Sequence, residues 1–280
     1  MTQKSKAQLL RRLHHGPRIL VLPNAWDAAS ARIFETAGFP AIATTSGGVA
    51  VSLGFPDGEN APRAEMLAAI NRIARSVAVP VTADIEAGYG AKPKDVAATV
   101  KGVIAAGAVG INLEDGIRHG QKPLRDIDEQ AERIRAAREA GSKAGVPLVI
   151  NARCDVYLRK AGDESERLEH TVRRARAYFE AGANCIFPIL APGGAIAALA
   201  REIEGPINVM VDAGTAPIAE LERLGVARVS FGSGPMRAAM ATAREIAQEL
   251  AQRGTYQTLL RDPIPSAEMN QMMQTIARRR

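Results

Sequence analysis

The feature that constrains this chain most is an alternation of short apolar segments with longer helix-like segments, which repeats eight times. Each apolar segment precedes a stretch with the spacing of an amphipathic helix. Eight such units predict an α/β fold, the closed parallel (β/α)8 or TIM barrel, because an open doubly wound sheet usually carries a Gly-rich dinucleotide turn after its first strand. Here that position reads NAWDAAS. The expected strands span residues 18–24, 41–46, 79–86, 109–115, 147–155, 184–190, 206–212 and 226–232.

The length of the chain fits one such barrel with a tail. An α/β barrel needs about 250 residues, and the chain has 280. We therefore expect residues 1–254 to form the barrel and residues 255–280 to form a C-terminal helical extension. Glycines stand where five of the helices are expected to end. They are Gly38, Gly107, Gly145, Gly182 and Gly225.

Composition excludes several classes of protein. No apolar stretch is long enough to span a membrane and the N-terminal residues lack a signal-peptide pattern, so we expect a cytoplasmic protein without a membrane partner. Cys154 and Cys185 fall inside expected strands, which predicts buried free thiols. The net charge of +6 lies mostly on helical faces without interleaved aromatic residues, so we expect no nucleic-acid partner. A positive field would instead attract a small anionic acid.

Acidic side chains gather where two neighbouring strands end, and active sites of barrels lie at that end. Period-two alternation places Asp84 and Glu86 on the inner face of one strand, and Asn112 and Glu114 on the inner face of the next. Three carboxylates there would repel one another without a cation, and oxygen ligands favour Mg²⁺, or alternatively Mn²⁺. The alternative is that these acids are exposed loop residues or helix caps.

Two further groups suit an anionic substrate. Arg153 lies at the end of the fifth strand, where its guanidinium could hold a carboxylate or phosphonate; the alternative is a structural ion pair. Ser46, Gly47 and Gly48 follow the second strand, where backbone N–H groups could approach an anion closely. Asp57 follows in a long loop expected to cover the barrel mouth.

At these residues the sequence resembles the isocitrate lyase/phosphoenolpyruvate mutase superfamily. The resemblance is carried by LPNAWDAASARIFETAGFPAIATTSGG, ADIEAGYG, INLEDG and INARCD in that order. It implies that Ser46, Gly47 and Gly48 bind the substrate carboxylate, and that Arg153 grips a second anionic group. It also implies that Asn208 lies near the substrate.

The same resemblance implies a metal and an assembly. Asp84 would contact Mg²⁺ directly, whereas Asp57, Glu86 and Glu114 would hold its water shell. Similar proteins are tetramers whose neighbours exchange a C-terminal helix, which would account for residues 255–280.

The chain departs from the lyases of that superfamily at two positions. Their gating loop carries a catalytic cysteine, whereas residues 116–124 here read GIRHGQKPL. His119 is the loop residue able to act as an acid, and the alternative is a solvated histidine. The lyases also carry a glutamate where this chain has Ile189. We therefore do not expect isocitrate or methylisocitrate lyase activity.

These observations lead to one expected reaction and two alternatives. We expect a Mg²⁺-dependent lyase that cleaves a C–C bond of a small 2-oxo acid through an enolate, as in oxaloacetate decarboxylation, with Arg153, Asp57, Glu114 and His119 as candidate catalytic residues. The first alternative is C–P cleavage or rearrangement of a phosphonopyruvate-like acid, with Asp57 as nucleophile. The second is a binding protein for 2-oxo acids without catalytic activity.

Overall fold

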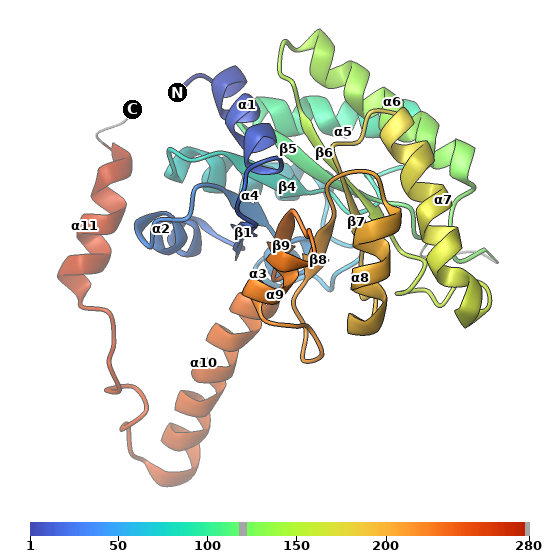
Figure 1. Cartoon of the computed structure of the whole chain (residues 1–280). Coiled ribbons are helices and arrows are strands. Elements are labelled where there is room, and N and C mark those ends of the chain that lie inside the picture. The colour runs from blue at the N-terminus through green and yellow to red at the C-terminus, as the bar shows by residue number, and fades with distance from the viewer. Residues whose placement is uncertain (118–121, 278–280) are drawn as a thin grey trace.

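The strands of the protein form a closed ring of parallel strands surrounded by helices (Figure 1). The computed structural model describes residues 1–117 and 122–277. One sheet runs in the order β2-β3-β4-β5-β6-β7 and a second in the order β1-β9-β8. A parallel bridge between Ile186 and Ile207 joins them at one seam, and β1 continues into β2 at the other. The predicted barrel is therefore confirmed. The strands are β1 Leu20–Leu22, β2 Asn24–Ala25, β3 Ile42–Thr44, β4 Val81–Asp84, β5 Gly110–Glu114, β6 Val149–Cys154, β7 Cys185–Pro188, β8 Asn208–Met210 and β9 Arg228–Ser230.

Proline divides the first expected strand. Residues 18–24 were expected to be continuous, but Pro23 separates β1 from β2. Proline has no backbone N–H and cannot donate to a strand ladder, although the Pro23 carbonyl still accepts from Ala43 N at 2.9 Å. As a result β1 pairs with β9, whereas β2 pairs with β3.

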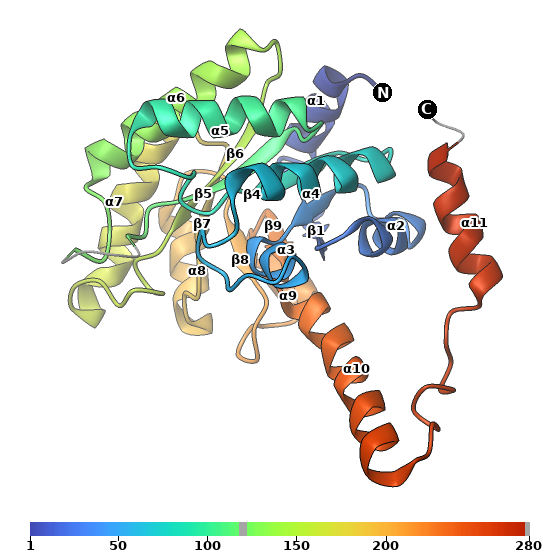
Figure 2. The same ribbon diagram turned by 180° about the vertical axis from the view of Figure 1, so that it is seen from behind.

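Helices cover the outside of the ring (Figure 2). The five junction glycines all have positive φ, from 70° at Gly145 to 104° at Gly182, as expected for residues that follow a helix end. The helices are α1 Gln3–Leu13, α2 Ala28–Thr36, α3 Ser46–Ser52, α4 Arg63–Ser76, α5 Pro93–Ala105, α6 Ile127–Lys143, the 3-10 helix η1 Glu164–Glu166, α7 Arg167–Glu180, α8 Gly193–Glu202, α9 Ile218–Arg223, α10 Gly234–Arg253 and α11 Ser266–Ala277.

The core between strands and helices consists mainly of buried Ala, Val, Ile and Leu side chains. Cys154 and Cys185 are buried and free, as predicted. Polar residues are also buried at strand positions, among them Thr82, Asn151, and Arg228. In the part of the chain that the structure describes, no helix is long and apolar enough to cross a lipid bilayer.

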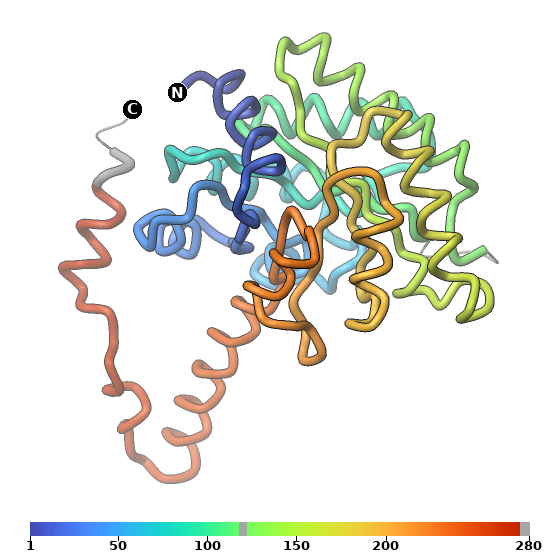
Figure 3. Tube along the Cα trace, viewed as in Figure 1, coloured from blue at the N-terminus to red at the C-terminus, as the bar shows by residue number. Residues whose placement is uncertain are grey.

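The C-terminal segment leaves the barrel and returns to it. Helix α10 projects outward, and the chain then turns back so that α11 runs beside α2 (Figure 3). The Nε of Arg32 on α2 donates to the carbonyl of Met272 on α11 at 3.0 Å. This arrangement is within one chain, and the exchange of the helix between subunits stays a prediction.

Candidate active site

A cavity of about 270 Å³ opens at the carboxyl ends of the strands. One part of its wall is polar and another is apolar. The polar part comprises Asn24, Thr45, Ser46, Gly47, Asp57, Asp84, Asn112, Arg153, Ser230, Gly232 and Ser233, and the apolar part comprises Leu158, Phe187, Ile189, Leu190 and Met210. Six of the polar residues singled out from the sequence therefore meet here, from five separate segments of the chain.

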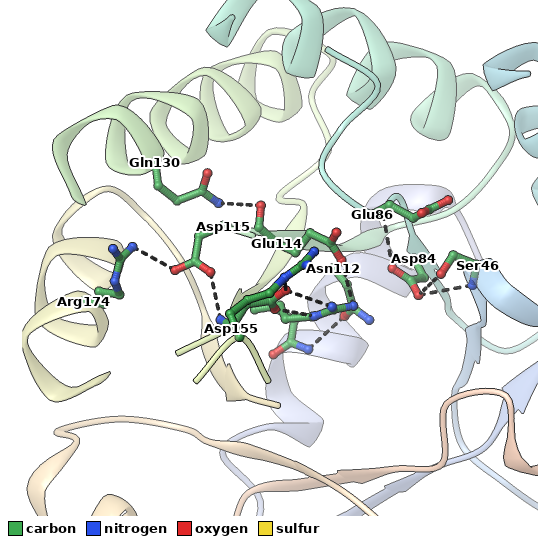
Figure 4. Close-up of polar contacts among 12 residues, drawn as sticks. Ser46, Asp84, Glu86, Asn112, Glu114, Asp115, Gln130, Asp155 and Arg174 are labelled. Atoms are coloured by element: carbon green, nitrogen blue, oxygen red, sulfur yellow. Dashed lines mark hydrogen bonds and ion pairs between the residues drawn. The ribbon is translucent and has the colours of Figure 1, made fainter. Parts of the chain in front are cut away.

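Asp84 is held by the residue that follows β3. Its Oδ2 accepts from both Ser46 Oγ at 2.8 Å and Ser46 N at 3.1 Å (Figure 4). Its backbone N donates to Thr44 Oγ1 at 2.9 Å. These contacts fix one carboxylate oxygen and turn the side chain toward the cavity.

Glu86 does not continue the alternation expected of the strand. β4 ends at Asp84, and Glu86 adopts a left-handed conformation with φ of 52°. Its Oε2 accepts from Glu59 N at 2.7 Å, and Glu59 Oε1 accepts in turn from Tyr89 N at 2.7 Å. Glu86 is therefore buried against the loop that carries Asp57 and does not line the cavity.

The field on this side of the cavity is negative. Burial raises the pKa of the Tyr89 hydroxyl, and the charges of Glu86, Glu59, Asp84 and Asp57 raise it further. Four carboxylates thus act on one phenol. Glu59 was not recognised in the sequence, where its position two residues after Asp57 was the only signal.

Arg153 combines both roles considered for it. It lines the cavity, and its Nη1 lies 2.7 Å from Glu114 Oε2. Its Nε and Nη2 donate to Asp155 at 2.7 and 3.0 Å. Burial lowers the pKa of the Arg153 guanidinium, but Glu114 and Asp155 outweigh it and the net shift is upward. Three of the five N–H groups of an arginine are engaged in this way, which leaves two for a ligand.

Behind Arg153 lies a buried polar cluster that the sequence did not reveal. Asp115 accepts from Arg174 Nη1 at 2.9 Å and from Asp155 N at 2.8 Å (Figure 4). It also accepts from the Tyr178 hydroxyl at 2.6 Å. Burial raises the pKa of Asp115, although Arg174 counteracts it. Arg174 Nη2 also donates to the carbonyl of Arg125. The cluster therefore connects the strand that carries Arg153 to the segment after residue 121.

The Ser46–Gly48 segment is the first turn of the short helix α3, not the loop expected from the sequence. Ser46 N donates to Asp84, and Gly48 N donates to Thr45 Oγ1 at 3.3 Å. Two of the three N–H groups are thus engaged within the protein. Gly47 lies against Asp57, whose Cγ would be 3.3 Å from a Cβ at that position.

The remaining sequence candidates lie in different surroundings. Asn208 is completely buried and reaches the cavity only through Ser230, to whose Oγ it donates at 3.1 Å. Ile189 lies in the apolar wall. His119 lies outside the described residues. Gly116 and Leu124 form a bridge on either side of that segment.

The carboxylate oxygens that line the cavity suit a hard cation that takes few ligands from the protein. Within residues 1–117 and 122–277, no three acidic, histidine or cysteine side chains come close enough to hold a metal together. Asp84 nevertheless lines the cavity together with a second carboxylate, that of Asp57. This chemistry suits Mg²⁺, which usually keeps several waters and takes one or two carboxylates from the protein.

The cavity of this parallel barrel thus carries carboxylates and an arginine at the carboxyl ends of its strands, where barrel enzymes have their active sites. The family model for phosphoenolpyruvate phosphomutase matches residues 10–251. The 2-methylisocitrate lyase of Escherichia coli (strain K12) is 34% identical over 251 residues, which is 84% of this chain and 80% of that protein.

Solved structures agree with this match. A candidate phosphonomutase from Burkholderia cenocepacia J2315 is 44% identical with a TM-score of 0.83, covering 89% of this chain and 99% of that chain. The oxaloacetate acetylhydrolase in complex with the product oxalate is 26% identical with a TM-score of 0.85, covering 98% and 96%. The chain belongs to the isocitrate lyase/phosphoenolpyruvate mutase superfamily, and it is an enzyme of that type, a metal-dependent lyase or mutase that acts on C–C or C–P bonds.

Proposed function

We propose that the protein is a Mg²⁺-dependent lyase that decarboxylates oxaloacetate or a closely related 2-oxo acid. The observation that carries this proposal is the division of the cavity wall, in which Asp84 and Arg153 lie on the polar part and Ile189 lies on the apolar part. A small dianion would place its 2-oxo acid end against the polar residues and its C3 substituent near the apolar wall.

In this proposal Asp84 is the direct metal ligand and Asp57 orients the surrounding water. Glu86 and Glu114, which were also expected to hold that water, do not line the cavity and act through the residues they contact, Glu59 and Arg153. Mn²⁺ is the alternative ion. The bound cation would withdraw electrons from the carboxylate and carbonyl of the substrate and so stabilise the enolate that forms on bond cleavage. Asp84 can fill this role because it lines the cavity and both of its oxygens are held by hydrogen bonds, Oδ2 by Ser46 and Oδ1 by Glu86 N at 3.3 Å.

Substrate orientation is assigned to Arg153, Ser46 and Gly47. The two N–H groups of Arg153 that are not engaged by Glu114 and Asp155 can donate to a substrate carboxylate. Glu114 and Asp155 hold the guanidinium in place for this contact. Gly48 and Asn208 act indirectly, Gly48 through the helical turn and Asn208 through Ser230.

The apolar part of the cavity wall suits CO₂ as the group that leaves C3 of the substrate better than it suits a charged or protonated leaving group. A carboxylate beside Phe187 and Ile189 is poorly solvated, and its departure as CO₂ removes the charge. The departing group also needs no proton donor. The chain has no cysteine in residues 116–124, and His119 remains a candidate acid for later protonation of the enolate.

The test is a comparison of substrates with purified protein. Pyruvate release from oxaloacetate, phosphonopyruvate and substituted malates is followed in Mg²⁺ and in EDTA. We expect Mg²⁺-dependent release from oxaloacetate that is lost in Asp84→Ala and Arg153→Ala and retained in Glu169→Ala, an exposed carboxylate on α7. Pyruvate release from a substituted malate alone would contradict decarboxylation and indicate C–C cleavage of the kind its named relatives perform.

C–P chemistry is the second candidate, and the position of Asp57 favours it. Its carboxylate lines the cavity against Gly47, where it could attack a phosphonyl group. Arg153 would then hold the phosphonyl oxygens. Phosphate release from phosphonopyruvate that is lost in Asp57→Asn would establish this reaction in place of decarboxylation.

We also propose that the protein is a homotetramer whose subunits exchange α11. Support comes from the apolar side chains exposed along the projecting segment, which are Met240, Leu250, Tyr256, Leu259, Leu260 and Ile264. Burial of such surface favours association. Light scattering of the full chain should give a tetramer, and removal of residues 255–280 should give a smaller species. An unchanged mass would contradict the exchange.

A further inference from the structure

Asn112 lines the cavity from β5, between β4, which carries Asp84, and β6, which carries Arg153. It lies on β5, where its register partners are Asp84 on β4 and Asn151 on β6. It is largely buried and lines the cavity. A side chain in this position can contact the ligand from below, provided that its amide is oriented correctly.

The orientation of that amide is set from inside the barrel. Asn112 Oδ1 accepts from Asn151 Nδ2 at 2.8 Å and lies 3.3 Å from Arg228 Nη2. A guanidinium has only donors, so the atom that faces Arg228 must be the oxygen. The amide nitrogen of Asn112 is therefore on the opposite side, and it donates to no residue that the structure describes.

Burial of the Arg228 guanidinium costs desolvation free energy that no ion pair in the described part of the chain offsets. It is completely buried at the start of β9, and none of the described carboxylates lies within ion-pair distance. Its Nε and Nη1 form no hydrogen bond with a described residue. Burial lowers the pKa of its guanidinium to about 10, although the negative charge of Asp84 acts in the opposite direction. Arg228 thus remains cationic at neutral pH while contributing little to the stability of the fold.

We propose that Arg228 is a positioning residue that fixes the Asn112 amide so that its Nδ2 N–H groups donate to an oxygen of the bound anion. Arg228 also polarises the Asn112 carbonyl, which strengthens donation from the nitrogen. The inference rests on the proposed function only in that the ligand is a small planar acid. It assigns Asn112 as a ligand contact and Arg228 as the residue acting through it.

Binding of oxalate, a planar dianion, tests this without turnover. Calorimetry in the presence of Mg²⁺ gives its affinity for the full chain. One hydrogen bond to a charged group corresponds to about a tenfold to hundredfold loss of affinity, which we expect in both Arg228→Met and Asn112→Leu. Because Arg228 acts through Asn112, the double variant should lose no more affinity than Asn112→Leu alone.

Thermal stability separates positioning from a structural role. Arg228→Met should keep or raise the Tm, since it replaces a buried cation with an apolar side chain. Arg138→Met is the matched control, because Arg138 donates to Gly182, Leu148 and Asn184 far from the cavity. That variant should lower the Tm and leave oxalate affinity unchanged.

Several results would overturn the inference. The first is an Arg228→Met variant that binds oxalate as tightly as the wild type. The second is a double variant whose loss of oxalate affinity is the product of the losses in the two single variants. The third is a wild-type protein that does not bind oxalate. A wild type that binds oxalate but releases no pyruvate from oxaloacetate would refute the proposed decarboxylation alone. The positioning role of Arg228 would stand in that case.

Discussion

Ser46 Oγ lies 2.8 Å from Asp84 Oδ2, and this contact joins the substrate-binding segment after β3 to the carboxylate at the end of β4. Removal of the hydroxyl in Ser46→Ala leaves the contact from Ser46 N and loosens the carboxylate. We expect the Mg²⁺ concentration for half-maximal thermal stabilisation to rise about tenfold, as for loss of one charge-assisted hydrogen bond. Asp84→Ala should abolish the stabilisation, and a Ser46→Ala variant with unchanged Mg²⁺ dependence would contradict this coupling.

The glycines that follow Ser46 should respond differently to a methyl group. A Cβ at Gly48 would lie 2.5 Å from Thr45 Cγ2 and 3.0 Å from Trp26 Cβ, whereas the nearest atoms to one at Gly47 belong to the Asp57 side chain, at 3.3 Å. We expect Gly48→Ala to destabilise the fold by about 1–3 kcal/mol through overpacking. Gly47→Ala should leave the Tm nearly unchanged and weaken ligand binding. Denaturant unfolding and calorimetry distinguish the two, and equal stability losses would contradict the prediction.

Asp115 should be more important for stability than its distance from the cavity suggests. Asp115→Asn leaves the buried Arg174 without its carboxylate, for which we expect a loss of about 3–5 kcal/mol in the free energy of unfolding. Tyr178→Phe removes one hydrogen bond and should cost about 1–2 kcal/mol. Urea unfolding measures both. Tyr256→Phe, at an exposed tyrosine, is the control and should have no effect.

His14 predicts how stability depends on pH. Burial lowers the pKa of its imidazole from 6.5 to about 3, with a further contribution from Arg228. The unfolded chain therefore takes up a proton below pH 6.5 that the folded protein does not. The stabilising contribution is complete above pH 6.5 and is lost as the pH falls toward 3. Between pH 6.5 and 5 we expect a fall of about 2 kcal/mol in the free energy of unfolding.

His14→Gln supplies the comparison for that measurement, because glutamine does not titrate. The variant should show a smaller decrease over the same pH interval in urea unfolding experiments. A parallel decrease in both proteins would mean that other groups dominate the pH dependence.

The sequence predicted the barrel because eight repeats of one period leave few topologies. It also located Asp84 and Arg153, since polar residues at strand ends face a common edge. It did not predict the short helix α3, which begins directly after a strand, or the turn of Glu86 away from the cavity, because a left-handed residue breaks the alternation.

The interior of the barrel was the least accessible to sequence reasoning. Arg228 stands in an apolar strand segment, and its role depends on the register between β9 and distant strands. The Asp115 cluster likewise brings together β5, β6 and α7, which no local pattern relates. Pairings of this kind arise from closure of the ring, so they appear only when the whole chain is folded.

The two seams of the ring have a consequence for dynamics. Asn24 and Ser230 line the cavity from either side of the break at Pro23, and Asn24 Oδ1 accepts from Phe231 N at 2.8 Å. A ligand that contacts both Asn24 and Ser230 would hold β2 and β9 together and so oppose local opening of β8 and β9. Amide hydrogen exchange in residues 206–232 should therefore slow on ligand binding, and fluctuation at these seams should inactivate the enzyme before the barrel unfolds.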